Sequence, residues 1–237
     1  MAIKPILFNT EMVRAILEGR KSCTRRIVKG FIPNDAKWGY TAFTPKGCIS
    51  CRGTFADGYG EKFFKLPCEP SDILYVRETW QYLYELDGNE QVIEDTGKYY
   101  YAATDIIPFN TYVDENGVEH DHAPWRPSIH MPKEAARIWL KVTNVRVERL
   151  QEMKPVDVIK EGAYPDCWDC LNTYEESGSQ CCYGTEEQCS QCDGVMMEWE
   201  KLWNSTIKKS DLDRYGWDTN PWVWVIEFER CEKPELN

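Results

Sequence analysis

The alternation of apolar and polar residues predicts that this chain is built largely from β-strands. The pattern is clearest over residues 136–150, where Ile138, Leu140 and Val142 alternate with Trp139 and more polar neighbours. A period of two residues is typical of a strand with one buried face. Comparable patterns predict further strands at residues 4–9, 72–80, 98–104 and 221–231.

Other stretches carry apolar residues at helical spacing. Met12 and Ile16 lie four positions apart, Thr10 is the expected N-cap of their helix, and Gly19 is its expected C-terminal stop. Two more helices are expected at residues 154–163 and 195–207. The second of these has an apolar stripe that is typical of core packing.

The order of these elements predicts an α+β protein and argues against a doubly wound sheet. We expect a small mixed β-barrel with flanking helices and long loop insertions, forming one domain over residues 1–237. Residues 30–70 are rich in Gly, Pro and polar residues and are expected to be irregular. The expected insertions cover residues 30–67, 81–120 and 164–194.

The charge is unevenly distributed along the chain. The whole protein has a formal net charge of −11, but residues 162–200 hold nine acids and no Lys or Arg, which leaves −11 + 9 = −2 for the rest. Residues 1–30 hold seven cations and two acids, a balance of +5. This distribution argues against broad nonspecific DNA binding and is compatible with a local anion site.

The N-terminus lacks the pattern of a signal peptide, and no apolar run approaches the ~20 residues of a membrane helix. We therefore expect a cytoplasmic protein without a membrane partner. In that compartment eleven cysteines indicate metal ligation or reduced thiols more than disulfides.

The acidic insert contains two Cys-x-x-Cys pairs, CWDC and CSQC. Cys167, Cys170, Cys189 and Cys192 have the spacing of a structural Zn²⁺ site, and a metal would fold a segment with few apolar residues. The alternative is an acidic loop with reduced thiols. The insert could also contact a protein partner. No organic cofactor is indicated.

Residues 19–26, GRKSCTRR, concentrate four cations in an acidic protein. Three interpretations stay open: a solvated charge run, a phosphate-binding patch, or the chemical part of an active site. An active site would need a nucleophile, a base and groups that stabilise an oxyanion. A strand would point residues 21 and 24 to opposite faces, so a turn after Gly19 is needed to bring them together.

Six ordered motifs resemble the ASCH-domain family of the PUA-like superfamily, in particular its phage and prophage members. They are GRKSCTRR, LYVRETW, WRPSIHMP, VTNVRVERLQEM, DVIKEGA and NPWVWVIEF. The family signature Gly-x-Lys-x-x-Glu-x-Arg is matched by Gly19, Lys21 and Arg26. Thr24 replaces the Glu, as in the small bacterial ASCH proteins that hydrolyse N4-acetylcytidine.

The resemblance implies a barrel with a cleft for RNA or a modified pyrimidine nucleoside. It implies that Lys21, Thr24 and Glu161 are catalytic and that the reaction is amide hydrolysis. Substrate-binding residues are expected at Arg20, Arg25, Arg26, Arg77, Glu78, Trp80 and His130. The alternatives are RNA or modified-base binding without chemistry, a ribonuclease, and an interaction protein that works through its acidic insert.

Overall fold

The computed structural model describes residues 1–235 except 86, 88, 90, 109–111, 115, 121, 122 and 164–189. The chain divides into two compact units. Unit 1 comprises Met1, Gly19–Asp72 and Lys141–Glu229, and unit 2 comprises Ala2–Glu18, Ile73–Leu140 and Arg230–Asn237. A single domain over residues 1–237 stays a prediction.

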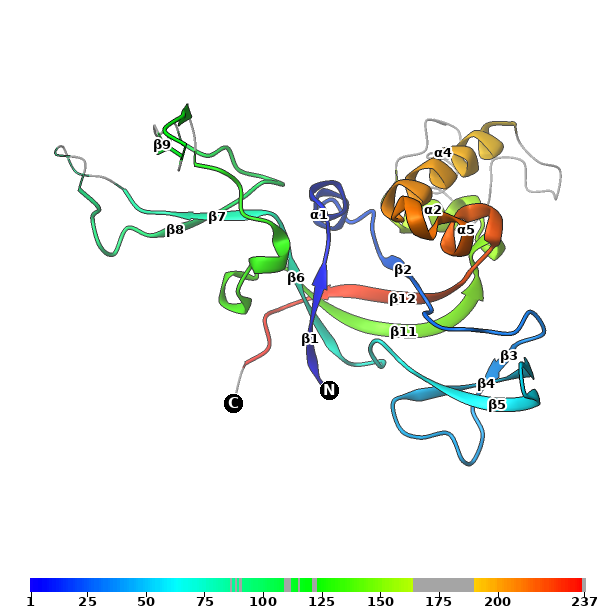
Figure 1. Ribbon diagram of the computed structural model, residues 1–237. Coiled ribbons are helices and arrows are strands. Elements are labelled where there is room, and N and C mark those ends of the chain that lie inside the picture. Colours follow the sequence, from blue (N-terminus) through cyan, green and yellow to red (C-terminus); the bar gives the residue numbers. More distant parts are fainter. Residues whose placement is uncertain are drawn as a thin grey trace. The chain divides into compact units, whose positions relative to one another are not determined.

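Unit 1 contains two sheets and a group of helices. Figure 1 shows α2, α4 and α5 together on one side of β11 and β12, with β3, β4 and β5 on the other side. Its strands are β2 (Cys23–Ile27), β3 (Lys37–Gly39), β4 (Cys48–Phe55), β5 (Gly58–Lys65), most of β11 (Trp139–Arg149) and most of β12 (Trp222–Cys231). Its helices are η3 (Leu150–Glu152), α2 (Pro155–Lys160), α4 (Ser190–Thr206), η4 (Lys209–Asp211), α5 (Leu212–Tyr215) and η5 (Trp217–Thr219).

The first sheet of unit 1 has the strand order β11-β12-β2. β12 is antiparallel to β2, so that Val225 lies opposite Arg25 and Ile226 lies opposite Thr24. Because opposite residues share a face, Val225 and Arg25 lie on one face of this sheet, and Ile226 and Thr24 lie on the other. Val223 and Val225 face a hydrophobic core that includes Leu150, Met153, Val158, Trp199 and Trp203.

The other face of this sheet carries an aromatic cluster. The ring of Trp38 on β3 lies 5.7 Å from the ring of Trp222 and 6.2 Å from that of Trp224, centroid to centroid. Trp38 also contacts Phe64 on β5 at 5.2 Å. These edge-to-face contacts join the two sheets of unit 1.

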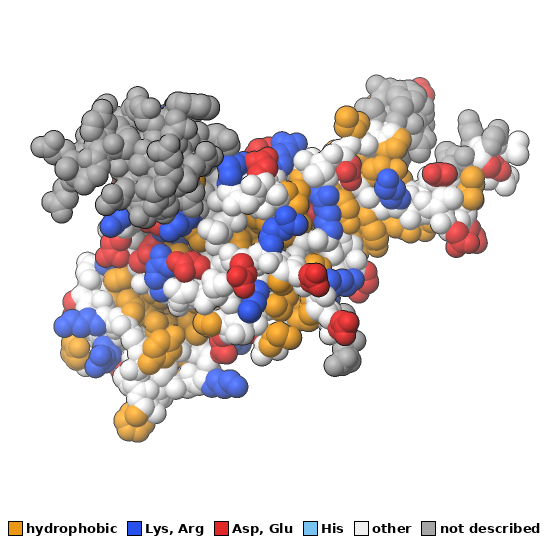
Figure 2. Space-filling view, turned by 180° about the vertical axis from the view of Figure 1, so that it is seen from behind, with side chains coloured by type: hydrophobic (Ala, Val, Ile, Leu, Met, Phe, Trp, Pro, Cys, Tyr) orange, Lys and Arg blue, Asp and Glu red, His pale blue; other side chains and the backbone are white. Residues whose placement is uncertain are grey.

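Residues 30–70 were predicted to be irregular. The prediction is wrong for residues 37–65, which contain the antiparallel sheet β3-β4-β5. β4 and β5 are joined by a tight turn at Ala56 and Asp57, and Gly58 follows with a φ of +109°. A positive φ favours glycine, and Asp-Gly between two strands is a strong hairpin signal. The apolar pattern did not predict this hairpin, since β5 has only one apolar side chain on its inner face, Phe64. Figure 2 shows Lys and Arg beside hydrophobic side chains at the lower left, in the region of this sheet.

Unit 2 begins with β1, which runs parallel to β6 with Ile3 opposite Ile73. Its core includes Ile73, Trp80, Met131 and Trp139. Its strands are β1 (Ile3–Leu7), β6 (Ile73–Arg77), β7 (Trp80–Leu83), β8 (Lys98–Tyr101), β9 (Tyr112–Val113) and β10 (Glu119–His120). Its helices are α1 (Thr10–Leu17), η1 (Ser128–His130) and η2 (Lys133–Ala135).

The C-terminal end of α1 confirms one prediction, and its N-terminal end corrects another. Gly19 has a φ of +80°, the left-handed conformation expected of a C-terminal stop. The N-cap, however, is Asn9 and not Thr10: the Asn9 side chain accepts a hydrogen bond from the Met12 backbone at 2.8 Å. Both residue types cap helices, and Asn9 stands one position ahead of the first helical residue.

The predicted α+β class is confirmed, with more strands than helices among the described residues. The sheets have linear strand orders, so in the described part of the chain no sheet is shown to close into the expected barrel. None of the described helices has the length and apolar character needed to cross a bilayer.

Candidate functional site

The centre of the candidate site is an ion pair between Lys21 and Glu161, which lie 140 positions apart in the sequence. The Lys21 Nζ is 2.9 Å from the Glu161 Oε2, and the two side chains are 0% and 2% exposed. The same ammonium donates to the backbone oxygens of Glu161 and Cys23, each at 2.7 Å. Its three protons therefore have three acceptors.

Local backbone contacts bring these residues together. Ser22 donates its backbone N–H to the Lys160 oxygen at 2.9 Å, and the Arg20 guanidinium donates to the Gly162 oxygen at 2.6 Å. Glu161 is the C-cap of α2, and Gly162 has a φ of +91°. The segment that follows Gly19 thus runs along the C-terminal end of α2, where carbonyl oxygens attract cations.

Arg25 is the second buried cation. Its guanidinium lies 3.2 Å from the Glu161 Oε1, 2.7 Å from the Glu148 Oε1 and 3.7 Å from the Asp157 Oδ2. The Arg25 side chain is 1% exposed. The nearby carboxylates raise the pKa of Arg25 although burial by itself lowers it, and the group is charged.

The cluster continues along β11 toward the surface. Arg146 contacts Glu148 at 3.2 Å and also pairs with Glu227 on β12. These pairs orient Glu148 toward Arg25. We refer to Lys21, Arg25, Glu148, Asp157 and Glu161 as the buried charge cluster.

Cys23 lies within this cluster on the same face of β2 as Arg25, and its Sγ is 3.9 Å from the Arg25 guanidinium. Burial and the charge of Glu161 raise the pKa of the Cys23 thiol to about 12, against the opposing effect of Arg25 and Lys21. The thiol is therefore neutral at physiological pH, and an unreactive thiol of this kind is structural.

Thr24 is buried and lies on β2 between Cys23 and Arg25. Since alternate residues of a strand point to opposite faces, its side chain leaves β2 on the face opposite that of Arg25. Arg26 lies on the same face as Thr24 and opposite Trp224. Burial lowers the pKa of the Arg26 guanidinium. The structure thus joins Lys21 to Glu161 and directs Thr24 to the other side of the strand.

Four predicted site residues lie in unit 2. Glu78 is 1% exposed and holds Arg137 through two contacts of 2.9 Å. Arg77 donates its Nε to the Met131 oxygen at 2.8 Å, which fixes the backbone before η2. Glu78 and Arg77 thus have structural partners within their own unit.

Trp80 and His130 complete the predicted set. The indole of Trp80 is buried, the guanidinium of Arg126 lies 5.2 Å from its ring centroid, and its Nε1 has no hydrogen-bond acceptor among the described residues. His130 is exposed at the end of the short helix η1.

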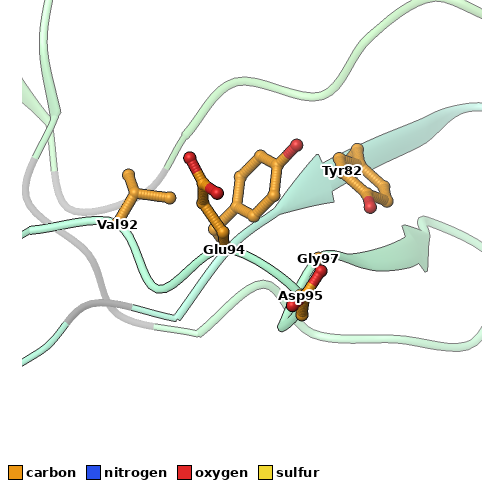
Figure 3. A pocket seen from close by; sticks show the side chains of 6 residues that line it. Tyr82, Val92, Glu94, Asp95 and Gly97 are labelled. Atoms are coloured by element: carbon orange, nitrogen blue, oxygen red, sulfur yellow. The ribbon is translucent and has the colours of Figure 1, made fainter.

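Unit 2 also contains a pocket of about 680 Å³. Figure 3 shows Val92, Glu94 and Asp95 on the segment that leads into β8, with Tyr82 on the neighbouring strand. A Cβ at Gly97 would collide with the Tyr82 hydroxyl, so a larger residue here would displace the Tyr82 side chain. The pocket lining contains none of the predicted site residues.

The predicted zinc ligands lie outside the part that the structure describes. Cys167, Cys170 and Cys189 fall in residues 164–189, and of Cys192 the structure describes only its backbone in α4. In the remaining, described residues no group of His, Cys, Asp or Glu side chains could hold a metal ion.

Glu148 and Asp157 complete the buried charge cluster, and neither was predicted from the sequence as a site residue. The alternation of β11 carried a signal, since Arg146 and Glu148 are polar residues on the face that also bears Leu150. A charged pair on a strand face that leads into a core indicates a partner from another element.

Comparisons with protein-family models, with curated proteins and with solved structures give no match to this chain.

Proposed function

We propose that this protein acts on RNA or on a modified pyrimidine nucleoside, and that it hydrolyses an N4-acyl amide of the N4-acetylcytidine type. The observation that supports the proposal is the contact of 2.9 Å between Lys21 and Glu161. These are two of the three groups implied by the ASCH resemblance, and they meet although they are distant in sequence. The PUA-like assignment belongs to this proposal.

The reaction transfers the acyl group to water and releases cytidine and acetate. In the proposed mechanism the Thr24 hydroxyl attacks the amide carbonyl, and the Lys21–Glu161 pair accepts the hydroxyl proton and returns it to the leaving amine of cytidine. Water then cleaves the acyl ester on Thr24, which releases acetate and restores the hydroxyl. This requires a rearrangement in the reacting state that separates the pair and brings Thr24 within its reach. Glu161 and Cys23 occupy all three donors of the ammonium, and Thr24 leaves β2 on the face opposite that of Arg25. Arg26, on the Thr24 face, orients the substrate.

The test is turnover of N4-acetylcytidine, with cytidine and acetate quantified by chromatography. Wild type should produce both, Thr24→Val should produce neither, and Thr24→Ser should retain activity because it keeps a hydroxyl. Thr24→Val keeps the size of the buried side chain, so its fold can be verified by a thermal melt. Absence of turnover by wild type, or equal turnover by Thr24→Val, would refute the hydrolysis.

The second candidate is a protein that binds RNA or a modified base without chemistry. Two observations favour it: the Lys21 ammonium is saturated by its acceptors, and Thr24 points away from the face of Arg25. Under this alternative, wild type and Thr24→Val bind RNA that contains N4-acetylcytidine with equal affinity, and neither releases acetate. Equilibrium binding and acetate release, measured on the same samples, separate the two candidates.

A structural Zn²⁺ at Cys167, Cys170, Cys189 and Cys192 is also proposed. Metal analysis of the purified protein should give one zinc per chain, and Cys167→Ser with Cys170→Ser should remove it. We further propose a cytoplasmic location, which fits the reduced thiols of Cys23, Cys48 and Cys51.

A further inference from the structure

The sheet β3-β4-β5 has one buried and one exposed face. Ile49, Cys51 and Phe55 point from β4 into the core of unit 1. On the opposite face of β4, Arg52 and Thr54 are exposed, whereas Ser50 is buried. The pairing register extends this exposed face across all three strands, because Arg52 lies opposite Lys37 on β3 and opposite Glu61 on β5.

The exposed face combines aromatic rings with cations. Tyr59 is 70% exposed and Phe63 is 41% exposed, and both lie on the face of β5 that also bears Glu61. Lys37 and Lys65 are exposed on the same face. Lys37 lies opposite Arg52, and Lys65 lies opposite Cys48. The connection from β3 to β4 exposes two more rings, those of Tyr40 and Phe43.

The charge of this sheet has the opposite sign to that of the protein. Residues 37–65 hold five Lys or Arg (37, 46, 52, 62 and 65) and two acids (57 and 61), a balance of 5 − 2 = +3, whereas the whole chain carries −11. Figure 2 shows Lys and Arg side chains next to hydrophobic ones in the region of the sheet. The local cations attract a polyanion to this place, and the excess of acids elsewhere in the chain repels it.

We propose that the exposed face of β3-β4-β5 binds single-stranded RNA. Aromatic rings stack on unpaired bases, and cations between them neutralise phosphates. Tyr59 and Phe63 are four residues apart on one strand, roughly 13 Å at about 3.3 Å per residue, which suits two bases of one nucleic-acid strand. A duplex keeps its bases stacked inside and cannot offer them to these rings.

Glu61 favours RNA over DNA. Its carboxylate lies between Tyr59 and Phe63 on β5 and accepts a hydrogen bond from the Ser50 hydroxyl. An acceptor at this place has no partner on a DNA backbone, whereas a ribose 2′-hydroxyl can donate to it. The inference extends the proposed function, because it names a surface for RNA outside the buried charge cluster.

The test is fluorescence anisotropy with three labelled probes: a 12-nucleotide U-rich RNA, the matching DNA, and a 12-base-pair RNA duplex. Wild type should bind the single-stranded RNA most tightly. Tyr59→Ala and Phe63→Ala should each weaken this binding about 10-fold, as expected from the loss of one stacked base. Replacing Lys37, Arg52 and Lys65 with Ser should reduce the slope of log affinity against log salt by about 2.

Two control variants test whether the loss of RNA binding is specific to this face. Tyr84→Ala removes a 45% exposed ring from unit 2, and the triple change of Lys201, Lys208 and Lys209 to Ser removes three exposed cations elsewhere in unit 1. Both control proteins should bind as wild type does. Glu61→Ala should remove the preference for RNA over DNA. Thermal melts verify that each variant is folded.

The proposal is overturned if wild type does not bind the single-stranded probe, if the duplex binds equally well, or if the aromatic variants bind like Tyr84→Ala. Its failure is separable from that of the amide hydrolysis. Thr24→Val should bind the U-rich RNA normally, and Tyr59→Ala should hydrolyse free N4-acetylcytidine at the wild-type rate.

Discussion

Unit 1 contains two groups of cations, one that is buried on folding and one that stays exposed. Lys21 and Arg25 come from the most basic stretch of the sequence, yet their side chains are 0% and 1% exposed and are paired with carboxylates. Arg52 and Lys65 come from a stretch predicted to be irregular, and they stay exposed beside aromatic rings. A high local density of cations in the sequence therefore did not identify the cations that a ligand can reach.

The physical reason is desolvation. A buried cation is tolerated only if carboxylates and backbone oxygens replace its water, and the buried charge cluster supplies Glu148, Asp157 and Glu161 for this purpose. An exposed cation keeps its water and can exchange it for a phosphate. The two groups therefore differ in what their removal should change: stability in one case and binding in the other.

The largest expected effect is on stability. Lys21→Met leaves the Glu161 carboxylate buried with Arg25 as its one remaining cation, so the free energy of unfolding in urea should fall by about 3–5 kcal/mol. The double variant Lys21→Met/Glu161→Leu should recover part of this loss, because it also removes the buried carboxylate that has lost the Lys21 ammonium. Lys201→Ala, which breaks the exposed pair with Glu198, serves as the control and should cause no measurable change. A loss below 1 kcal/mol for Lys21→Met would contradict the structural role of the cluster.

The second prediction concerns the Cys23 thiol. Its pKa is about 12 in the folded state against an ordinary value of 9.0, so the unfolded chain releases this proton first as the pH rises. The contribution of Cys23 to stability is complete below pH 9 and is lost as the pH rises toward about 12. At pH 8, iodoacetamide should modify Cys23 far more slowly than Cys48, which is partly exposed.

Peptide mapping by mass spectrometry measures both rates in one sample. If Cys23 reacts only through unfolding, Lys21→Met should accelerate its modification. Equal rates for Cys23 and Cys48 in wild type would show that the buried charge cluster is open to solvent.

The third prediction concerns the exposed cations. The triple change of Lys37, Arg52 and Lys65 to Ser should leave the urea unfolding midpoint as in wild type, because these side chains are solvated in the folded and the unfolded chain. The same protein should lose affinity for the single-stranded RNA probe. A large fall in the midpoint would assign these cations to folding instead of binding.

The smallest expected effect is at Gly19, which positions the segment that carries Lys21. Gly19 has a φ of +80° and open space around the position of a Cβ, so Gly19→Ala meets no steric contact. The cost should be that of the left-handed conformation alone, about 1 kcal/mol. Urea unfolding measures it, and Gly60→Ala, also in open space but without a positive φ, is the matched control.

The sequence predicted the elements whose pattern is local. Alternation located β1, β6, β8, β11 and β12, and helical spacing located α1, α2 and most of α4. The hairpin β4–β5 was missed because its stability comes from pairing and from one buried face, while β5 by itself is almost entirely exposed. The cap of α1 was misplaced by one residue since neighbouring Asn9 and Thr10 are both capping types.

What the sequence by itself determined is the α+β class, the position of most helices and strands, and the choice of Lys21 and Glu161 as residues to examine. Only the tertiary structure decided that these two meet in a buried ion pair, that Arg25 joins them through its own contact with Glu161, and that Thr24 leaves the strand on the other face. Periodicity fixes which side of an element a residue occupies. Contact between charges distant in sequence depends on how elements pack, and there burial requires that every charge find its partner.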